Sequence, residues 1–79
     1  MSDLIMVQFR SKTEPLVYAG KEYAYRTLID VEIGDLVVVP VRNELDIARV
    51  SAINVPESKV DERIMPFLKT VEKKWEKPI

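Results

Sequence analysis

The run LVVVPV at residues 36–41 constrains the fold of this chain more than any other feature. Valine is β-branched and favours the pleated backbone of a strand. Apolar residues at nearly every position indicate a strand that is covered on both faces, or one that lies in a curled sheet. Gly34 and Asp35 precede the run and predict a turn, because glycine allows positive φ and aspartate bonds nearby backbone amides. Pro40 has no N–H, so it predicts a sheet edge, a bulge or the point where the strand leaves its partner.

Several other short segments have the composition of strands. Residues 4–10 alternate between two faces, which is typical of a half-buried strand. Residues 22–28 are rich in aromatic and β-branched side chains, and residues 46–55 form a further candidate strand. Residues 16–18 add a short extended piece. In the turn before the strand at 46–55, we expect Asn43 to take the left-handed conformation.

The C-terminal segment fits two alternatives. Its apolar residues are spaced by four, three and four positions, as in an amphipathic helix: Ile64, Leu68, Val71 and Trp75. Residues 67–73 also alternate as in a strand, and we prefer the strand because the other short strands need a closing partner. The prediction is one domain over residues 1–79, mainly β: a small five-stranded, curled antiparallel barrel with a solvated tail at 74–79. A short C-terminal helix is the alternative.

The composition excludes most kinds of chemical site. The 79 residues contain no cysteine and no histidine, so disulfides, thiolate metal sites and the commonest general base are absent. Two glycines cannot supply a glycine-rich phosphate loop, and the carboxylates lack the spacing of a calcium loop. We therefore predict no enzymatic activity, no metal and no cofactor. The absence of cysteine, of an export signal and of a long apolar run predicts a cytoplasmic protein that does not enter a membrane.

Twelve basic and thirteen acidic residues give a net charge of −1. This balance provides no overall attraction to nucleic acid, so any such contact needs a local patch. Four arginines on or beside the predicted strands are candidates for that patch: Arg10, Arg26, Arg42 and Arg49. The alternative is that they are ordinary solvated strand residues, which we prefer.

Three aromatic residues are candidates for a binding surface. Tyr23 and Tyr25 lie two residues apart, so they share a face of their strand and predict either an aromatic platform or core packing, of which we prefer packing. Trp75 stands among lysines, which predicts either a docking tail or a residue that covers the end of the sheet. Covering is the preferred interpretation.

The pattern over residues 34–41, followed by Ala48 and Val50, resembles the strand–turn–strand core of small barrels of the Src-homology-3, Tudor and KOW type. Pro40 also occupies a position similar to a proline in the N-terminal DNA-binding domain of the primosomal replication-restart helicase. The resemblance implies a small barrel. Where KOW modules have a turn glycine that approaches nucleic acid, this chain has residues 42–44, Arg-Asn-Glu, which argues against binding of that kind.

With Tyr23, Tyr25, Arg26 and residues 70–73 included, the chain resembles small phage-encoded proteins of unknown function. We therefore expect a non-catalytic interaction module of phage origin that binds another protein in the host cytoplasm. A nucleic-acid-binding barrel that uses the arginines and tyrosines is the first alternative. A homodimer formed by pairing of edge strands is the second.

Overall fold

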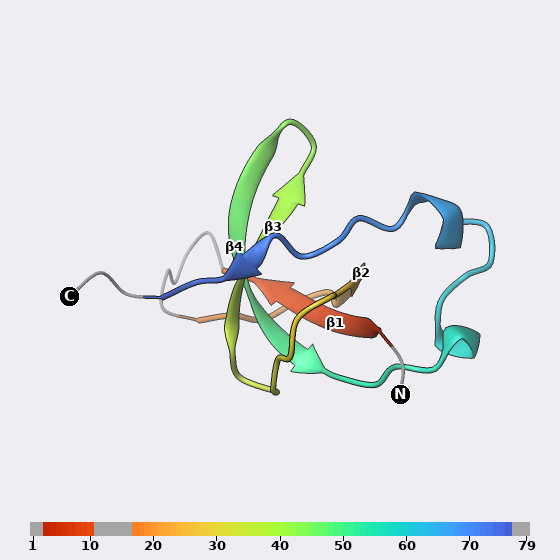
Figure 1. Ribbon diagram of the computed structural model, residues 1–79, viewed down its shortest axis with the longest axis horizontal. Helices are drawn as coiled ribbons and strands as arrows, with labels where there is room; N and C mark the ends of the chain where they lie inside the picture. Colours follow the sequence, from red (N-terminus) through yellow and green to blue (C-terminus); the bar gives the residue numbers. More distant parts are fainter. Residues whose placement is uncertain (1–2, 11–16, 77–79) are drawn as a thin grey trace.

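The computed structural model describes residues 3–10 and 17–76, which form a five-stranded antiparallel sheet with strand order β2-β1-β4-β3-β5 (Figure 1). The strands are β1 (Leu4–Phe9), β2 (Tyr23–Arg26), β3 (Leu36–Val41), β4 (Glu44–Ala52) and β5 (Lys73–Lys74). Two short 3-10 helices, η1 (Glu57–Lys59) and η2 (Met65–Phe67), lie between β4 and β5. The described residues contain no α-helix.

The structure confirms a mainly β, five-stranded antiparallel fold and corrects its shape. The sheet is open, because β2 and β5 are its two edges and are not neighbours in the strand order. The predicted curled barrel is therefore wrong, because the sheet is neither closed nor strongly curled. The alternative of a short C-terminal helix is also wrong, since the described residues after η1 contain, as helix, only the three-residue 3-10 helix η2.

The inner strand β1 has buried residues on both of its faces, and this explains its two sets of apolar residues. Ile5 and Val7 belong to a first core cluster, which also contains Tyr25, Val37, Val39, Ala48, Val50 and Val71. Leu4 points to the opposite face and belongs to a second cluster with Val55 and Val60. The chain after β4 covers this second face, passing out through η1 and η2 before it returns to β3 (Figure 1).

The turn before β3 is held by backbone and side-chain bonds. Gly34 has φ +97°, in the left-handed region, and its N–H donates to the carbonyl of Val50 at 2.9 Å. The Asp35 carboxylate accepts the Glu32 N–H at 2.9 Å and forms an ion pair with Lys74 at 3.4 Å. The bond from Glu32 is the main reason that the pKa of Asp35 is lowered, with a further contribution from Lys74.

Pro40 lies where one side of β3 has lost its strand partner. β4 pairs with all of β3, including Pro40 opposite Leu45, whereas β5 pairs only with Val37 and Val38. A residue without an N–H therefore costs no ladder hydrogen bond at this position.

The β3–β4 hairpin differs from the prediction in its left-handed residue. Arg42, with φ +56°, takes this conformation, and Asn43 has no positive φ. The preference of asparagine for left-handed backbone was outweighed by the geometry of the two-residue connection between Val41 and Glu44.

The C-terminal segment passes from β2 to β3. An isolated parallel bridge joins Thr70 to Arg26, and β5 then pairs with β3, so the predicted continuous strand over residues 67–73 is wrong. The segment is held at two separate places, by the bridge to Arg26 and by the pairing of β5 with β3, and not along one continuous strand pair. In the described part of the predicted solvated tail, Lys74 and Glu76 are exposed; Lys74 belongs to β5, and the Trp75 N–H donates to the Leu36 carbonyl. Residue 16 and residues 77–79, which also carried predictions, lie outside the described residues.

Candidate functional site

The outer edge of β3 has its carbonyl groups hydrogen-bonded even where no strand pairs with it. Backbone N–H groups of Trp75 and Glu72 donate to the carbonyls of Leu36 and Val38. Further along, side chains take over: the Tyr25 hydroxyl donates to the Pro40 carbonyl at 3.0 Å, and Lys69 Nζ to the Arg42 carbonyl at 3.4 Å. The four carbonyls just named on the outer edge of β3 are therefore not free to accept a hydrogen bond from an added strand.

The outer edge of β2 is different. The Arg26 N–H donates to the Lys69 carbonyl at 2.9 Å, and the Val71 N–H donates to the Arg26 carbonyl at 2.8 Å. Because backbone groups point the same way at every second residue of a strand, the N–H and carbonyl of Ala24 also point away from β1. Within the described part of the chain, no backbone hydrogen bond joins this side of β2 to another segment before Arg26.

A groove of about 260 Å³ lies along this free edge, and we call it the edge groove. It is lined by Tyr23, Ala24, Tyr25, Pro40, Val41, Arg42, Ile64, Phe67, Leu68 and Lys69. Phe67 is 78% exposed, and Ile64 and Tyr23 are 48% and 45% exposed. Large apolar side chains exposed together in a concave site are typical of interaction surfaces.

The edge groove has positive charge. Arg42 and Lys69 line it, and none of the described residues in its lining is an aspartate or glutamate. Lys21 lies beside it, with its Nζ atom 5.4 Å from the centre of the Tyr23 ring.

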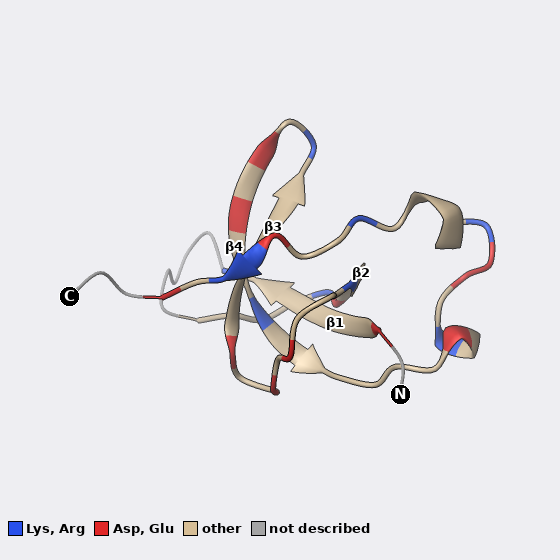
Figure 2. Cartoon of the chain, viewed as in Figure 1, with Lys and Arg blue, Asp and Glu red and all other residues tan. Residues whose placement is uncertain are grey.

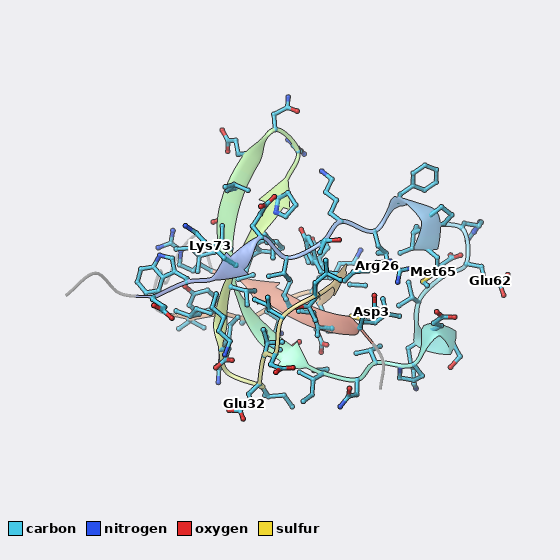
Figure 3. The ribbon with its side chains drawn as sticks, viewed as in Figure 1. Asp3, Arg26, Glu32, Glu62, Met65 and Lys73 are labelled. Atoms are coloured by element: carbon cyan, nitrogen blue, oxygen red, sulfur yellow. The ribbon has the colours of Figure 1, made fainter. Side chains whose placement is uncertain are left out.

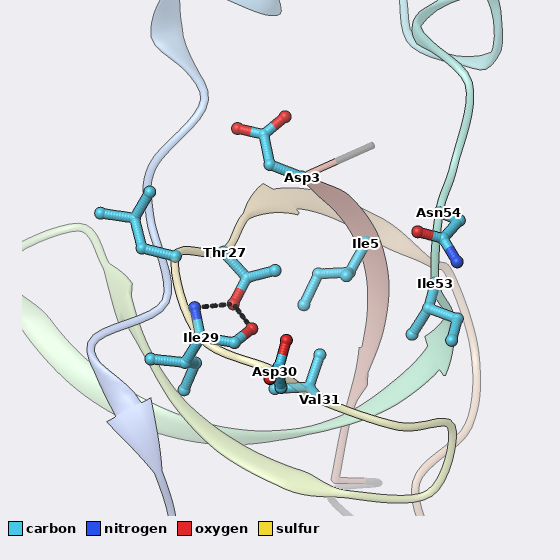
Figure 4. A pocket seen from close by; sticks show the side chains of 9 residues that line it. Asp3, Ile5, Thr27, Ile29, Asp30, Val31, Ile53 and Asn54 are labelled. Carbon is cyan, nitrogen blue, oxygen red and sulfur yellow. Dashed lines mark hydrogen bonds between the residues drawn. The ribbon is translucent and has the colours of Figure 1, made fainter. Parts of the chain in front are cut away.

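A second concavity, the acidic pocket, has a volume of about 330 Å³ (Figure 4). Ile5, Leu28, Ile29, Val31 and Ile53 provide its apolar wall, and Asp3 and Asp30 provide its charge, with Thr27 and Asn54 completing the lining. The Thr27 hydroxyl donates to the Ile29 carbonyl and accepts the Ile29 N–H, which fixes the loop on one side of the pocket. Among the described residues, no lysine or arginine lines it.

The four arginines that were candidates for a patch lie in three places. Arg26 forms an ion pair with Asp3 at 3.2 Å, and the two lie together in Figure 3. Arg42 lines the edge groove. Arg10 follows the end of β1 and Arg49 lies on β4, both exposed. The structure therefore does not gather the four arginines into one site.

Arg10 and Arg49 do share one face with Trp75. Arg49 is paired with Gln8 on β1 and with Leu36 on β3, and Trp75 bonds to Leu36. These residues point away from the first core cluster, since their neighbours Ala48 and Val37 belong to it. We call this surface, formed by Arg10, Leu36, Arg49, Lys73 and Trp75, the basic face. The lysines of β5 are visible as the blue edge strand in Figure 2.

The two tyrosines have separate roles. Tyr25 is only 8% exposed and belongs to the first core cluster, so it cannot form part of an exposed platform. Burial, with a smaller contribution from Asp46, raises the pKa of its hydroxyl. Tyr23 remains accessible and packs edge-on against Phe9, with ring centres 5.4 Å apart.

Sequence reasoning named Tyr23, Tyr25 and Arg42, which line the edge groove, but it missed Phe67 and Ala24. Phe67 was interpreted as one position of a strand, and Ala24 as an ordinary strand residue. A detectable signal was Pro66, which follows Met65 and disfavours a regular strand at that position. Pro66 lies in η2, whose short turn leaves Phe67 exposed.

In residues 3–10 and 17–76, no group of three or more histidine, cysteine, aspartate or glutamate residues could hold a metal ion. The same part of the chain has no helix that is long and apolar enough to cross a membrane. Comparison with models of protein families, with curated proteins and with solved structures finds no significant match. The resemblance to phage-encoded proteins and to small barrels of known families therefore stays a prediction.

Proposed function

We propose that this protein is a non-catalytic interaction module that binds another protein at the edge groove. The observation that carries the proposal is the exposure of Phe67 and Ile64 in one groove with Tyr23 and Arg42. Burying a large apolar side chain stabilises a complex by about 1.5–3 kcal/mol. Tyrosine and arginine are also among the residues that contribute most to protein interfaces.

Quantitative affinity capture from a cell lysate tests this function with two matched variants. Phe67→Ser removes an exposed aromatic side chain from the edge groove. Leu28→Ser removes an equally exposed apolar side chain, 86% accessible, from the acidic pocket. Both variants should keep the fold because neither side chain is buried. We expect Phe67→Ser to lose the captured protein and Leu28→Ser to retain it. Unchanged capture by Phe67→Ser would contradict the proposal.

A second candidate function, contact with nucleic acid, has support from the basic face. Arg10, Arg49 and Lys73 could neutralise phosphates there, and Trp75 could stack on a base. Gel retardation of a single-stranded oligonucleotide at about 50 mM salt tests it, since phosphate contacts are strongest at low salt. The test variant is Arg49→Glu, and the control is Arg63→Glu, whose arginine pairs with Asp61 away from the basic face. This candidate fails if the protein does not retard the oligonucleotide, or if both variants behave alike.

A further inference from the structure

We propose that the protein partner is recognised by strand addition: an extended segment of it pairs with the outer edge of β2 at Ala24. The partner segment has apolar residues at alternate positions and carries carboxylates. This inference rests on the proposed function of the edge groove and specifies the chemistry of its ligand.

The first step concerns the backbone. The N–H and carbonyl of Ala24 both point away from β1 and into the edge groove, as the hydrogen bonds of Arg26 show. An extended peptide satisfies such a pair of groups with its own carbonyl and N–H. This is the way in which added strands gain affinity without depending on sequence.

The second step concerns the direction of the ladder. The protein's own residues 69–71 already pair with Arg26 along the same side of β2. A partner strand at Ala24 would therefore continue a line of hydrogen bonds that the fold has begun. The opposite wall of the groove, at Pro40 and Arg42, has its carbonyls bonded to Tyr25 and Lys69, so it does not compete for the strand.

The third step concerns the partner's side chains. Successive side chains of a strand point to opposite faces, so every second residue of the partner faces the groove. Phe67, Leu68 and Ile64 provide apolar contacts there. This geometry selects apolar residues at alternate positions of the partner.

The fourth step concerns charge. Arg42 and Lys69 line the groove, and no carboxylate lines it among residues 3–10 and 17–76. Like charges brought together at an interface are unfavourable, so basic segments are rejected and acidic ones are favoured. The acidic pocket, with Asp3 and Asp30, has the opposite preference and does not suit the same segment.

Selection from a displayed library of random peptides of about eight residues, which extend over roughly 26 Å, tests the inference. We expect the selected peptides to alternate apolar residues with aspartate or glutamate. Their affinity should fall about tenfold or more for Ala24→Pro, which removes the outward N–H. Proline is tolerated on an edge strand when its nitrogen faces outward, so this variant should keep its fold. Ala24→Ser retains the N–H and serves as the matched control.

Amide hydrogen exchange of the unmodified protein gives an independent measurement if Ala24→Pro fails to fold. The Ala24 amide should exchange fast alone and become protected when a selected peptide binds. Peptides that require Phe67 but leave the Ala24 amide unprotected would overturn strand addition while the proposed function stands. If no selected peptide depends on Phe67, both proposals fail. Protection of Ala24 without peptide, growing with protein concentration, would instead identify a second copy of the chain as the occupant.

Discussion

Gly34 and Arg42, at the two ends of β3, both have left-handed backbone, with φ +97° and +56°. We predict that Gly34→Val destabilises the protein by about 1–3 kcal/mol, because a β-branched residue is strained at this φ. Of the described atoms, only Arg49 Nη2 comes near a Cβ added at Gly34, at 3.9 Å, so the strain comes from the backbone and not from a clash. Asn43→Val, at a residue without positive φ, is the control. Urea midpoints measure both, and equal midpoints would contradict the turn geometry.

Because of Asp35, the free energy of unfolding should depend on pH in the acid range. Its folded pKa lies below the ordinary value of 3.8, chiefly because it accepts the Glu32 N–H. The carboxylate therefore stabilises the fold above the unfolded pKa, and this contribution is lost as the pH falls through the folded pKa. Asp35→Ala should be less stable than the natural protein at neutral pH, and the difference should shrink well below pH 3.8.

Asp35→Asn separates the two causes of this effect. It keeps an acceptor for the Glu32 N–H but loses the charge that pairs with Lys74. Because the backbone bond is the larger cause, we expect its urea midpoint at neutral pH to lie closer to that of the natural protein than to that of Asp35→Ala. A constant difference between natural protein and Asp35→Ala at all pH values would contradict this account.

The hydrogen bond from the Tyr25 hydroxyl to the outer edge of β3 should contribute to the stability of the protein. Tyr25→Phe keeps the buried ring but removes the hydroxyl that donates to the Pro40 carbonyl at 3.0 Å. We expect a loss of about 0.5–1.5 kcal/mol from urea unfolding, the usual contribution of one hydrogen bond. Because the folded pKa of Tyr25 is raised, its stabilising effect is present below the unfolded pKa of 10.0 and is lost as the pH rises through the folded value. A variant as stable as the natural protein would show that water replaces the bond.

At the scale of elements, the segment from Lys69 to Trp75 bonds to both β2 and β3, and its Val71 side chain packs in the core between them. Val71 is 6% exposed and packs in the first core cluster, whereas its neighbour Glu72 is exposed. We predict that Val71→Ala lowers the free energy of unfolding by about 1.5–2.5 kcal/mol, because it removes two buried carbon groups and leaves a cavity. Glu72→Ala should change it by less than about 0.5 kcal/mol. Similar losses for both variants would contradict the packing described for this segment.

Local pattern was enough to predict strands near β1, β2, β3 and β4, because their alternation or β-branched composition is a property of neighbouring residues. The path of the C-terminal segment was not predictable in this way. Its shape depends on bonds to Arg26 and Leu36, which are distant in sequence. The same reason explains the edge groove, since Ala24, Arg42 and Phe67 meet only after the sheet has formed.

On the scale of the whole molecule, the sheet has a protected centre and less protected edges. We predict that amide exchange is slowest in the three inner strands, β1, β4 and β3, which have strand neighbours on both sides. Within β2, the Tyr25 amide faces β1 and should be protected, whereas the Ala24 amide should exchange much faster. Exchange measured by NMR at low protein concentration checks this contrast. Equal protection of the two amides would mean that the outer edge of β2 is paired.

The shortness of the two edge strands has a consequence for how the protein behaves when concentrated. An open sheet can grow by recruiting further chains, and long flat edges lead to fibrils. Here β2 has four residues and β5 has two, and both residues of β5 are lysines. The lysine ammonium groups of β5 repel the same strand of a second chain. Because both edge strands are short, a second chain that paired with either would form few backbone hydrogen bonds. The outer edge of β2 can thus stay open for the proposed partner strand without becoming a template for polymerisation of the protein.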